Sequence, residues 1–230
     1  MPDTLAIVPA RGGSKRIPRK NIRPMLGRPA IGWPIAALNA SGLEGRVFVS
    51  TDDPEIAEVA RAVGAQTPFM RPPNLADDHT GLRPVIVDAC NRIGAHDDDL
   101  VVCVLPTAVL LDAATIDRLL AAHAGVPQGF AFLAAPYGHP PQRGFTLDTD
   151  GRPTMAHPEY AGTRTQDLPT LWHDTGTAYV AHAGVWRAET PVFGATSLAV
   201  HAEPHTAIDI DTEADWYTAE ALLAWRRALA

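Results

Sequence analysis

The sequence predicts an α/β fold in which helices flank a mostly parallel sheet. Short apolar runs rich in Val, Ile and Leu alternate along the chain with longer stretches at the helical period. The apolar runs are continuous, as expected of parallel strands that are buried on both faces. With 230 residues, the chain suits a single domain. We place an insertion within this domain at about residues 136–180, where the alternation breaks.

The expected elements follow one another in chain order. Strands are expected at Leu5–Pro9, Arg46–Thr51, Leu100–Leu105 and Phe130–Ala134, and helices near Ala30–Ala40, Pro54–Val63, Arg83–Ile93 and Ala113–Ala122. Two of the helices have recognisable starts. Asp53 precedes a proline at the first helical position, and Asp112 can cap the helix that follows it.

The insertion has its own pattern. Asp150 and Gly151 form a turn signal between two short segments, which predicts a hairpin, and a polar loop then runs to His173. We expect this insertion to carry substrate contacts, subunit contacts or both, because loops on a scaffold often carry function. From residue 207 onward, the pattern predicts a short strand, an Asp-rich turn and an amphipathic helix.

Charge is distributed unevenly along the chain. The 19 basic and 26 acidic residues give a net charge of −7, which argues against nucleic acid or an anionic membrane as partner. Residues 1–43, however, hold seven basic residues against one acidic residue. No apolar run approaches the ~18–20 residues of a membrane span. The two cysteines, Cys90 and Cys103, are too few for a disulfide framework, so we expect a cytoplasmic protein.

The concentrated positive charge surrounds a glycine-containing loop. The first expected strand runs into Ala10, Arg11, Gly12, Gly13, Ser14, Lys15 and Arg16, and Lys20 and Asn21 follow shortly after. Adjacent glycines can direct backbone N–H groups toward an anion, and Arg and Lys side chains add cations. The loop matches neither the P-loop nor the dinucleotide fingerprint. It still suits a triphosphate, the alternative being a solvated basic loop.

Two carboxylates near the end of the chain form a second candidate site. Asp209 and Asp211 are two residues apart, so on an extended segment they share one face. Mg²⁺ takes such hard oxygen ligands together with substrate phosphates. The alternative is a capping role at the last helix. In combination with the basic loop, the pair favours a metal site.

These motifs resemble a known family. The run V-P-A-R-G-G-S-K-R-I-P-R-K-N at residues 8–21 is similar to the signature of cytidylyltransferases that activate eight- and nine-carbon keto-sugar acids with CTP. Further similarities follow in the family's order at residues 49–53, 71–72, 106–108 and 208–213. Within the family, residues 142–143, 163–168 and 173–174 most resemble the pseudaminic acid branch.

The resemblance implies a fold, a reaction and a set of site residues. The fold would be Rossmann-like, of the nucleotide-diphospho-sugar transferase type, and CTP plus a keto-sugar acid would give a CMP-sugar and pyrophosphate. Arg11 and Lys20 would be catalytic at the triphosphate, and Asp209 and Asp211 would be catalytic and bind Mg²⁺. The nucleotide would contact Pro9, Ala10, Arg11, Gly12, Gly13, Ser14, Arg16, Lys20, Asn21, Arg71, Asp77 and Thr80. The acceptor would contact Gln142, Arg143, Arg164, Gln166, His173, Asp174 and Tyr179. A homodimer, with the insertion reaching the partner's site, is also implied.

Three residues depart from the family pattern. Leu82, Val109 and Thr177 stand where a hydroxyl residue, a proline and a glutamine are usual. These three positions lie outside the triphosphate and metal motifs, in segments that the resemblance places near the base and the acceptor. The alternatives are therefore CMP transfer to a sialic, legionaminic or unrelated small acid and, with less support, a catalytically inactive CTP-binding module.

Overall fold

A six-stranded sheet organises the chain in this computed structural model, which describes residues 2–203, 206 and 208–229. Its strands are β1 (Thr4–Pro9), β4 (Val47–Ser50), β5 (Leu100–Val104), β6 (Ala131–Pro136), β9 (Trp172–His182) and β10 (Leu198–His201). They lie in the order β10-β6-β9-β5-β1-β4. Only β9 runs antiparallel to its neighbours in this sheet. The predicted mostly parallel sheet is thus confirmed.

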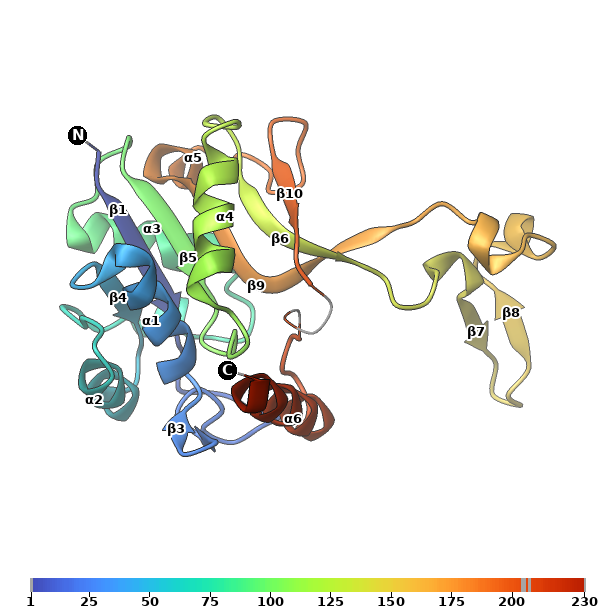
Figure 1. Ribbon diagram of the computed structural model, residues 1–230, viewed down its shortest axis with the longest axis horizontal. Coiled ribbons are helices and arrows are strands. Elements are labelled where there is room, and N and C mark those ends of the chain that lie inside the picture. Colours follow the sequence, from blue (N-terminus) through green and yellow to red (C-terminus); the bar gives the residue numbers. More distant parts are fainter. Residues whose placement is uncertain (1, 204–205, 207, 230) are drawn as a thin grey trace.

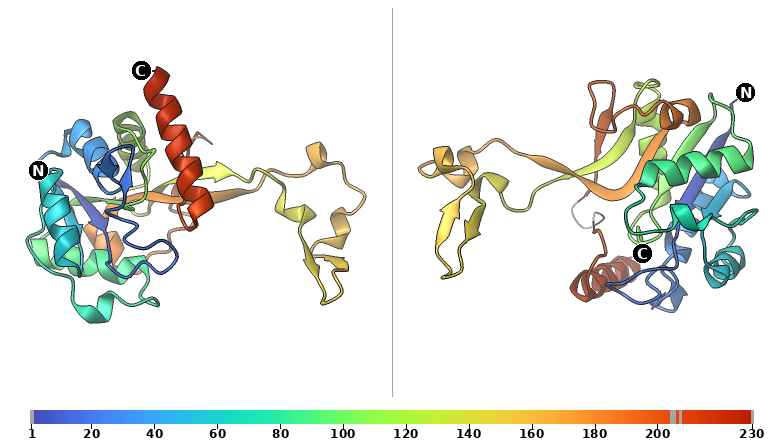
Figure 2. Two further views of the ribbon diagram at one scale, coloured as in Figure 1. Left: turned by 90° about the horizontal axis from the view of Figure 1, so that it is seen from below. Right: turned by 180° about the vertical axis from the view of Figure 1, so that it is seen from behind.

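Helices cover both faces of the sheet (Figures 1 and 2). One face carries α1 (Gly32–Leu38) and α4 (Ala113–His123), and the other carries α3 (Leu82–Ile93) and α5 (Ala183–Arg187). Helix α2 (Pro54–Ala62) follows β4, and α6 (Glu213–Leu229) lies near the short strands β2 (Pro24–Met25) and β3 (Arg28–Pro29). The four predicted helices are present with shifted ends. The first is shorter than expected, because its last turn becomes a short π-helix at Asn39–Leu43.

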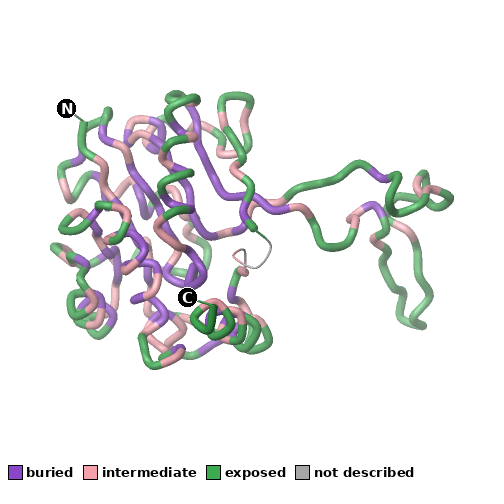
Figure 3. The backbone as a smooth tube through the Cα atoms, viewed as in Figure 1, coloured by how far each residue is buried: buried purple, intermediate pink, exposed green. Residues whose placement is uncertain are grey.

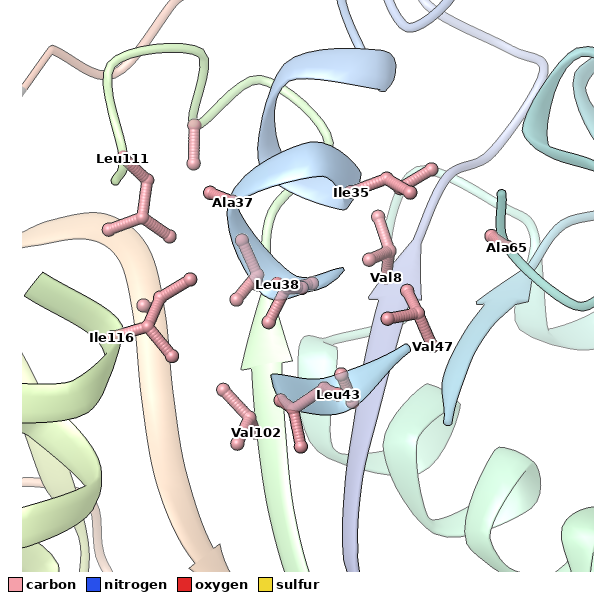
Figure 4. Packing of buried hydrophobic residues seen from close by; sticks show 14 of the residues in the cluster. Val8, Ile35, Ala37, Leu38, Leu43, Val47, Ala65, Val102, Leu111 and Ile116 are labelled. Atoms are coloured by element: carbon pink, nitrogen blue, oxygen red, sulfur yellow. The ribbon is translucent and has the colours of Figure 1, made fainter. Parts of the chain in front are cut away.

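Successive residues of β1 point to opposite faces of the sheet and pack into different hydrophobic clusters. Val8 packs with Leu38 of α1 and Ile116 of α4 on one face of the sheet (Figure 4). Ile7 packs on the opposite face with residues such as Ile86 of α3. Burial on both faces explains why these strands read as continuous apolar runs. The structure also confirms the predicted helix caps: the carboxylates of Asp53 and Asp112 accept backbone N–H bonds at the starts of α2 and α4.

The insertion forms an arm, residues 137–171, that projects from the body and is largely exposed (Figures 1 and 3). The predicted hairpin is present as β7 (Phe145–Leu147) and β8 (Pro153–Met155). This arm is shorter than the approximate range of 136–180 expected for the insertion, because Pro136 ends β6 and residues 172–180 belong to β9. The first half of β9 is polar and contains Gly176, so it lacks the apolar pattern of a buried strand.

Residues 208–211, the described part of the short strand expected from residue 207, form no strand. Their apolar members pack under α6 instead: Ile210 is buried in a third cluster with Ile17 and Trp216, and Ile208 packs against it. The alternation of this segment therefore reflects packing against a helix rather than sheet pairing. Within the described residues, no helix combines the length and apolarity needed to cross a membrane.

Candidate functional site

A pocket of about 590 Å³ opens where β1 and β5 end. It is lined by Pro9, Arg11, Ser14, Lys15, Arg16, Lys20, Asn21, Asp78, Leu105, Pro106, Thr107, Asp209 and Asp211. The carboxyl ends of parallel strands are the usual ligand site in α/β folds. The fold therefore brings the predicted triphosphate loop and the predicted metal ligands into one pocket, although they lie at opposite ends of the chain.

Carboxylates pair with the cations of this pocket. Arg11 Nη1 donates to Asp78 Oδ1 at 2.7 Å and to the Asp77 carbonyl oxygen at 2.9 Å. Lys15 also pairs with Asp78, and Arg16 Nη2 lies 2.8 Å from Asp211 Oδ1. Ion pairs this exposed to water contribute little stability. A triphosphate, with several charged oxygens, can therefore replace these carboxylate partners.

Lys20 and Asn21 connect the basic loop to its surroundings. Lys20 Nζ donates to the Ile210 carbonyl oxygen at 2.6 Å and lies 3.5 Å from Asp211 Oδ1. The Asn21 side chain is buried, and its Nδ2 donates to the Arg11 carbonyl oxygen at 2.9 Å. Lys20 thus spans from the loop to the side of the pocket that contains Asp211, while Asn21 fixes the backbone beside Arg11.

Three backbone amides at the start of the loop, those of Ala10, Gly12 and Ser14, are already hydrogen-bonded within the protein. Gly12 N–H donates to Asp52 Oδ1 at 2.9 Å, and Ser14 N–H donates to the Gly12 carbonyl oxygen at 3.0 Å. Ala10 is fully buried, and its N–H donates to the Ser50 carbonyl oxygen. Ala10, Gly12 and Gly13 do not line the pocket. The positive charge of the site therefore comes from side chains, because neighbouring groups already accept these amide hydrogens.

Asp209 and Asp211 both face the pocket and fit a magnesium ion. Burial, and then the proximity of Asp211, raise the pKa of Asp209, as expected where negative charge awaits a cation. Gly176 has a φ of +62°, and a Cβ there would lie 3.1 Å from Asp209 Oδ2, so glycine leaves this carboxylate room. The described residues contain no group of three or more potential metal ligands. An ion here would thus complete its shell with phosphate oxygens and water.

Besides Ala10, Gly12 and Gly13, three more residues assigned to the nucleotide lie outside the pocket lining: Arg71, Asp77 and Thr80. Arg71 is buried behind it, where its Nε donates to Ser50 Oγ at 3.1 Å and burial lowers its pKa. Asp77 Oδ1 accepts the N–H groups of His79 and Thr80 and so closes a turn. The Asp77 carboxylate is used in this turn, and its neighbour Asp78 lines the pocket in its place. Thr80 does not line the pocket.

Three residues expected to contact the acceptor, His173, Asp174 and Tyr179, lie on β9 beside a second pocket. Tyr179 donates a hydrogen bond to Asp174 Oδ2, and both residues line an apolar pocket of about 250 Å³ with Leu82, Arg83, Trp186, Val192 and Phe193. Leu82, expected near the nucleotide, thus faces this apolar pocket. The His173 ring contacts the Tyr137 ring in a tilted arrangement, and His173 lines a neighbouring pocket that also contains Asp174.

The other residues expected to contact the acceptor lie in the arm, away from the basic loop (Figure 1). Gln142 is buried within the arm, and its Nε2 donates to the Pro169 carbonyl oxygen at 2.8 Å. Arg143 Nη2 donates to the Thr163 carbonyl oxygen at 2.7 Å, and Arg164 is exposed. Gln166 lines a small pocket of the arm itself. The fold therefore does not bring these four residues to the pocket of their own chain.

Comparisons with known proteins agree with this geometry. Residues 5–193 match the family described as cytidylyltransferase. The chain belongs to the cytidylyltransferase family. A pseudaminic acid cytidylyltransferase from Campylobacter jejuni subsp. jejuni serotype O:2 is 36% identical over 95% of both chains. A CMP-N,N'-diacetyllegionaminic acid synthase from Legionella pneumophila is 28% identical, again over 95% of both chains.

Solved structures support the fold of this family member. A CMP:2-keto-3-deoxy-manno-octonic acid synthetase complexed with CTP has a TM-score of 0.66 and 18% identity, and the match covers 97% of this chain and 99% of that one. At this identity, the similarity shows a shared fold. The predicted nucleotide-diphospho-sugar transferase type of fold is confirmed.

Five pocket residues of this cytidylyltransferase were not assigned to the site from sequence. They are Lys15, Asp78, Leu105, Pro106 and Thr107. A signal existed for most of them, because Lys15 lies in the basic loop, Leu105 ends an expected strand, and residues 106–108 match the family pattern. Asp78 lies between Asp77 and Thr80, in a segment that the family resemblance places beside the nucleotide, but only the path of its loop brings it against Arg11.

Proposed function

We propose that this cytidylyltransferase transfers CMP from CTP to the anomeric hydroxyl of a pseudaminic-type nonulosonic acid and releases pyrophosphate. The observation that carries the proposal is the single pocket in which Arg11 and Lys20 face Asp209 and Asp211. The similarity to a pseudaminic acid cytidylyltransferase over 95% of the chain supports the acceptor class.

The protein must stabilise developing negative charge in this reaction, whereas the acceptor itself supplies the nucleophile. The acceptor hydroxyl attacks the α-phosphate in line with the departing pyrophosphate, and negative charge builds on the phosphate oxygens. Arg11 and Lys20 neutralise that charge from fixed positions. Ser14 and Asn21 hydrogen-bond the nucleotide. We assign Mg²⁺ to Asp209 and Asp211, where it would supply further positive charge to the phosphate oxygens.

The position of the arm supports a homodimer. Arg143 and Arg164 lie away from their own pocket, and a guanidinium can bind a carboxylate in bidentate fashion. We therefore propose that each arm reaches the partner's site and that its arginines bind the acceptor carboxylate there. The arm and its base expose Tyr137, Phe145, Leu147, Leu171 and Trp172, apolar surface that a second subunit would cover.

A turnover assay with several acceptors tests this proposal. Purified protein would be incubated with CTP, Mg²⁺ and pseudaminic, legionaminic or sialic acid, and pyrophosphate and CMP-conjugates would be measured. We expect the highest kcat/KM with pseudaminic acid. A folded sample that binds CTP but turns over none of the acids would instead indicate an inactive nucleotide-binding module. We place the reaction in the cytoplasm, consistent with the free, buried thiols Cys90 and Cys103.

A legionaminic-type acid is the second candidate acceptor. The similarity to a CMP-N,N'-diacetyllegionaminic acid synthase covers as much of the chain, at lower identity. Leu82, one of the three departures from the family pattern, lines the pocket beside Tyr179. An acceptor with a different apolar substituent could be accommodated there. A higher kcat/KM for legionaminic acid than for pseudaminic acid would favour this alternative.

A further inference from the structure

Ser50, the last residue of β4, and the aspartates after it contact three segments that form or lie behind the nucleotide site. Strands β1 and β4 are neighbours, with Pro9 opposite Ser50, so the loops that follow them begin side by side. Ser50 Oγ accepts a hydrogen bond from the buried Arg71, and Asp52 accepts one from the Gly12 N–H of the glycine loop. Asp53 accepts one from Arg19, in the turn before Lys20. Neither aspartate lines the pocket itself. Their contacts are therefore with the residues that form the site.

Asp52 and Asp53 hold the glycine loop at close range. Asp52 Oδ1 accepts the Gly12 N–H at 2.9 Å. A Cβ at position 12 would lie 2.7 Å from Asp53 Oδ2 and 3.0 Å from Asp53 Cβ, distances that leave no room for a side chain. The close approach of Asp53 thus favours glycine at position 12. Arg11, the residue before it, is held in the pocket by the same arrangement.

Asp53 also holds the turn that carries Lys20. Arg19 has a φ of +54°, an uncommon conformation for a residue with a side chain. Its guanidinium pairs with Asp53 and Glu55, and the ion pair with Arg19 lowers the pKa of Asp53. The Arg19 carbonyl oxygen accepts from the Ile22 and Arg23 N–H groups. The side-chain pairs and the backbone bonds together maintain the turn from which Lys20 reaches across the pocket.

We propose that Asp52 and Asp53 are positioning residues of the triphosphate site, acting through Gly12 and Arg19. The inference rests on the proposed function for CTP as ligand. Two negative charges beside a polyanion site oppose nucleotide binding by electrostatics alone, so neutralising them would then strengthen it. A positioning role predicts the reverse, because the cations lose their fixed arrangement when the carboxylates are removed. The two roles thus shift CTP affinity in opposite directions.

Steady-state kinetics with matched variants separate these effects. We expect Asp52→Ala and Asp53→Asn each to raise the KM for CTP about tenfold, the effect of one well-placed interaction. Asp52→Asn should restore most of the affinity, because its amide oxygen can still accept the Gly12 N–H. At position 53, asparagine still caps α2, so the loss there reports on Arg19.

Asp112→Asn is the matched control. Asp112 also caps a helix and pairs with an arginine, with Arg226 Nη2 at 2.7 Å from its Oδ2, and it lies outside the pocket lining. We expect a change in thermal stability comparable to that of Asp53→Asn and an unchanged KM for CTP. An equal or lower KM in Asp52→Ala and Asp53→Asn, relative to wild type, would overturn the positioning role.

Amide hydrogen exchange of the nucleotide-free protein provides a readout that does not depend on activity. Asp52→Ala and Asp53→Asn should accelerate exchange in residues 10–21, whereas Asp112→Asn should leave that segment unchanged. If the wild-type protein neither binds nor turns over CTP, the proposed function fails, and exchange alone then decides the positioning role. Unchanged exchange in the aspartate variants would refute it.

Discussion

Lys20 joins the two halves of the pocket, since its ammonium contacts the carbonyl oxygen of Ile210 while its backbone belongs to the basic loop. We expect Lys20→Ala to lower kcat/KM by about 100-fold or more, because a fixed cation at the developing charge is lost. Lys15→Ala is the matched control. Lys15 lies in the same loop but is 79% exposed, so its loss should cost less than tenfold. Similar losses in both variants would contradict a special role for Lys20.

Asp211 faces both the cations and the proposed magnesium ion. We expect Asp211→Asn to raise the Mg²⁺ concentration needed for half-maximal activity, because a neutral amide is a weaker ligand than a carboxylate. Titration of Mg²⁺ into EDTA-treated protein measures this. Asp117→Asn, an exposed position on α4, should match the wild-type titration. An Asp211→Asn protein with a wild-type Mg²⁺ requirement would exclude Asp211 as a ligand.

At the scale of elements, the end of α4 introduces a pH dependence of stability. His123, its last residue, is buried, and its ring lies 5.0 Å from that of His182 on β9. Burial and the neighbouring His182 lower the pKa of His123. The unfolded chain therefore binds this proton more readily than the folded chain, so stability is retained above the ordinary histidine pKa and falls as the pH drops below it.

Denaturant titrations between pH 7 and pH 5 test this dependence. The free energy of unfolding should decrease toward pH 5 in the wild-type protein, and His123→Leu should decrease less steeply, because it cannot take up the proton. His157→Leu, which removes an exposed histidine of the arm, should keep the wild-type slope. Equal slopes in His123→Leu and wild type would assign the acid sensitivity to other groups.

At the scale of the whole molecule, the arm determines whether the site is complete within one chain. If Arg164 serves the partner's site, Lys20→Ala and Arg164→Ala proteins should each be nearly inactive, while their mixture should recover activity. A randomly exchanged mixture would reach about a quarter of the wild-type rate, since half of the dimers hold one intact site in two. Subunits would be mixed under conditions that allow exchange, and turnover of CTP with acceptor would be followed.

Two observations would complete that experiment. Light scattering should give the mass of a dimer for wild type and for both variants. Arg152→Ala, in the exposed hairpin of the same arm, should retain full activity, since Arg152 pairs only loosely with Asp150 at 4.0 Å. Monomers in solution, or no recovery on mixing, would contradict an arm that acts in the partner's site.

Local patterns predicted much of this fold because the interactions behind them are local or periodic. The apolar runs of β1, β4, β5 and β6 follow from burial on both faces, and Asp53 and Asp112 cap helices through bonds to residues two or three positions away. The basic loop was recognisable because its positive charge is unusual for an acidic chain. The pair Asp209 and Asp211 became a candidate site only in combination with that loop and with the family resemblance.

Tertiary structure decided the features that depend on distant partners. The polar half of β9 is a strand because β6 pairs with it, and a single sequence does not reveal that partner. The Gly12 N–H donates to Asp52, and Arg11 donates to Asp78. Both hydrogen bonds form because neighbouring loops converge at one edge of the sheet. The sequence alone thus identified candidate residues and their charges. Which of them face one pocket depended on the packing of segments far apart in the chain.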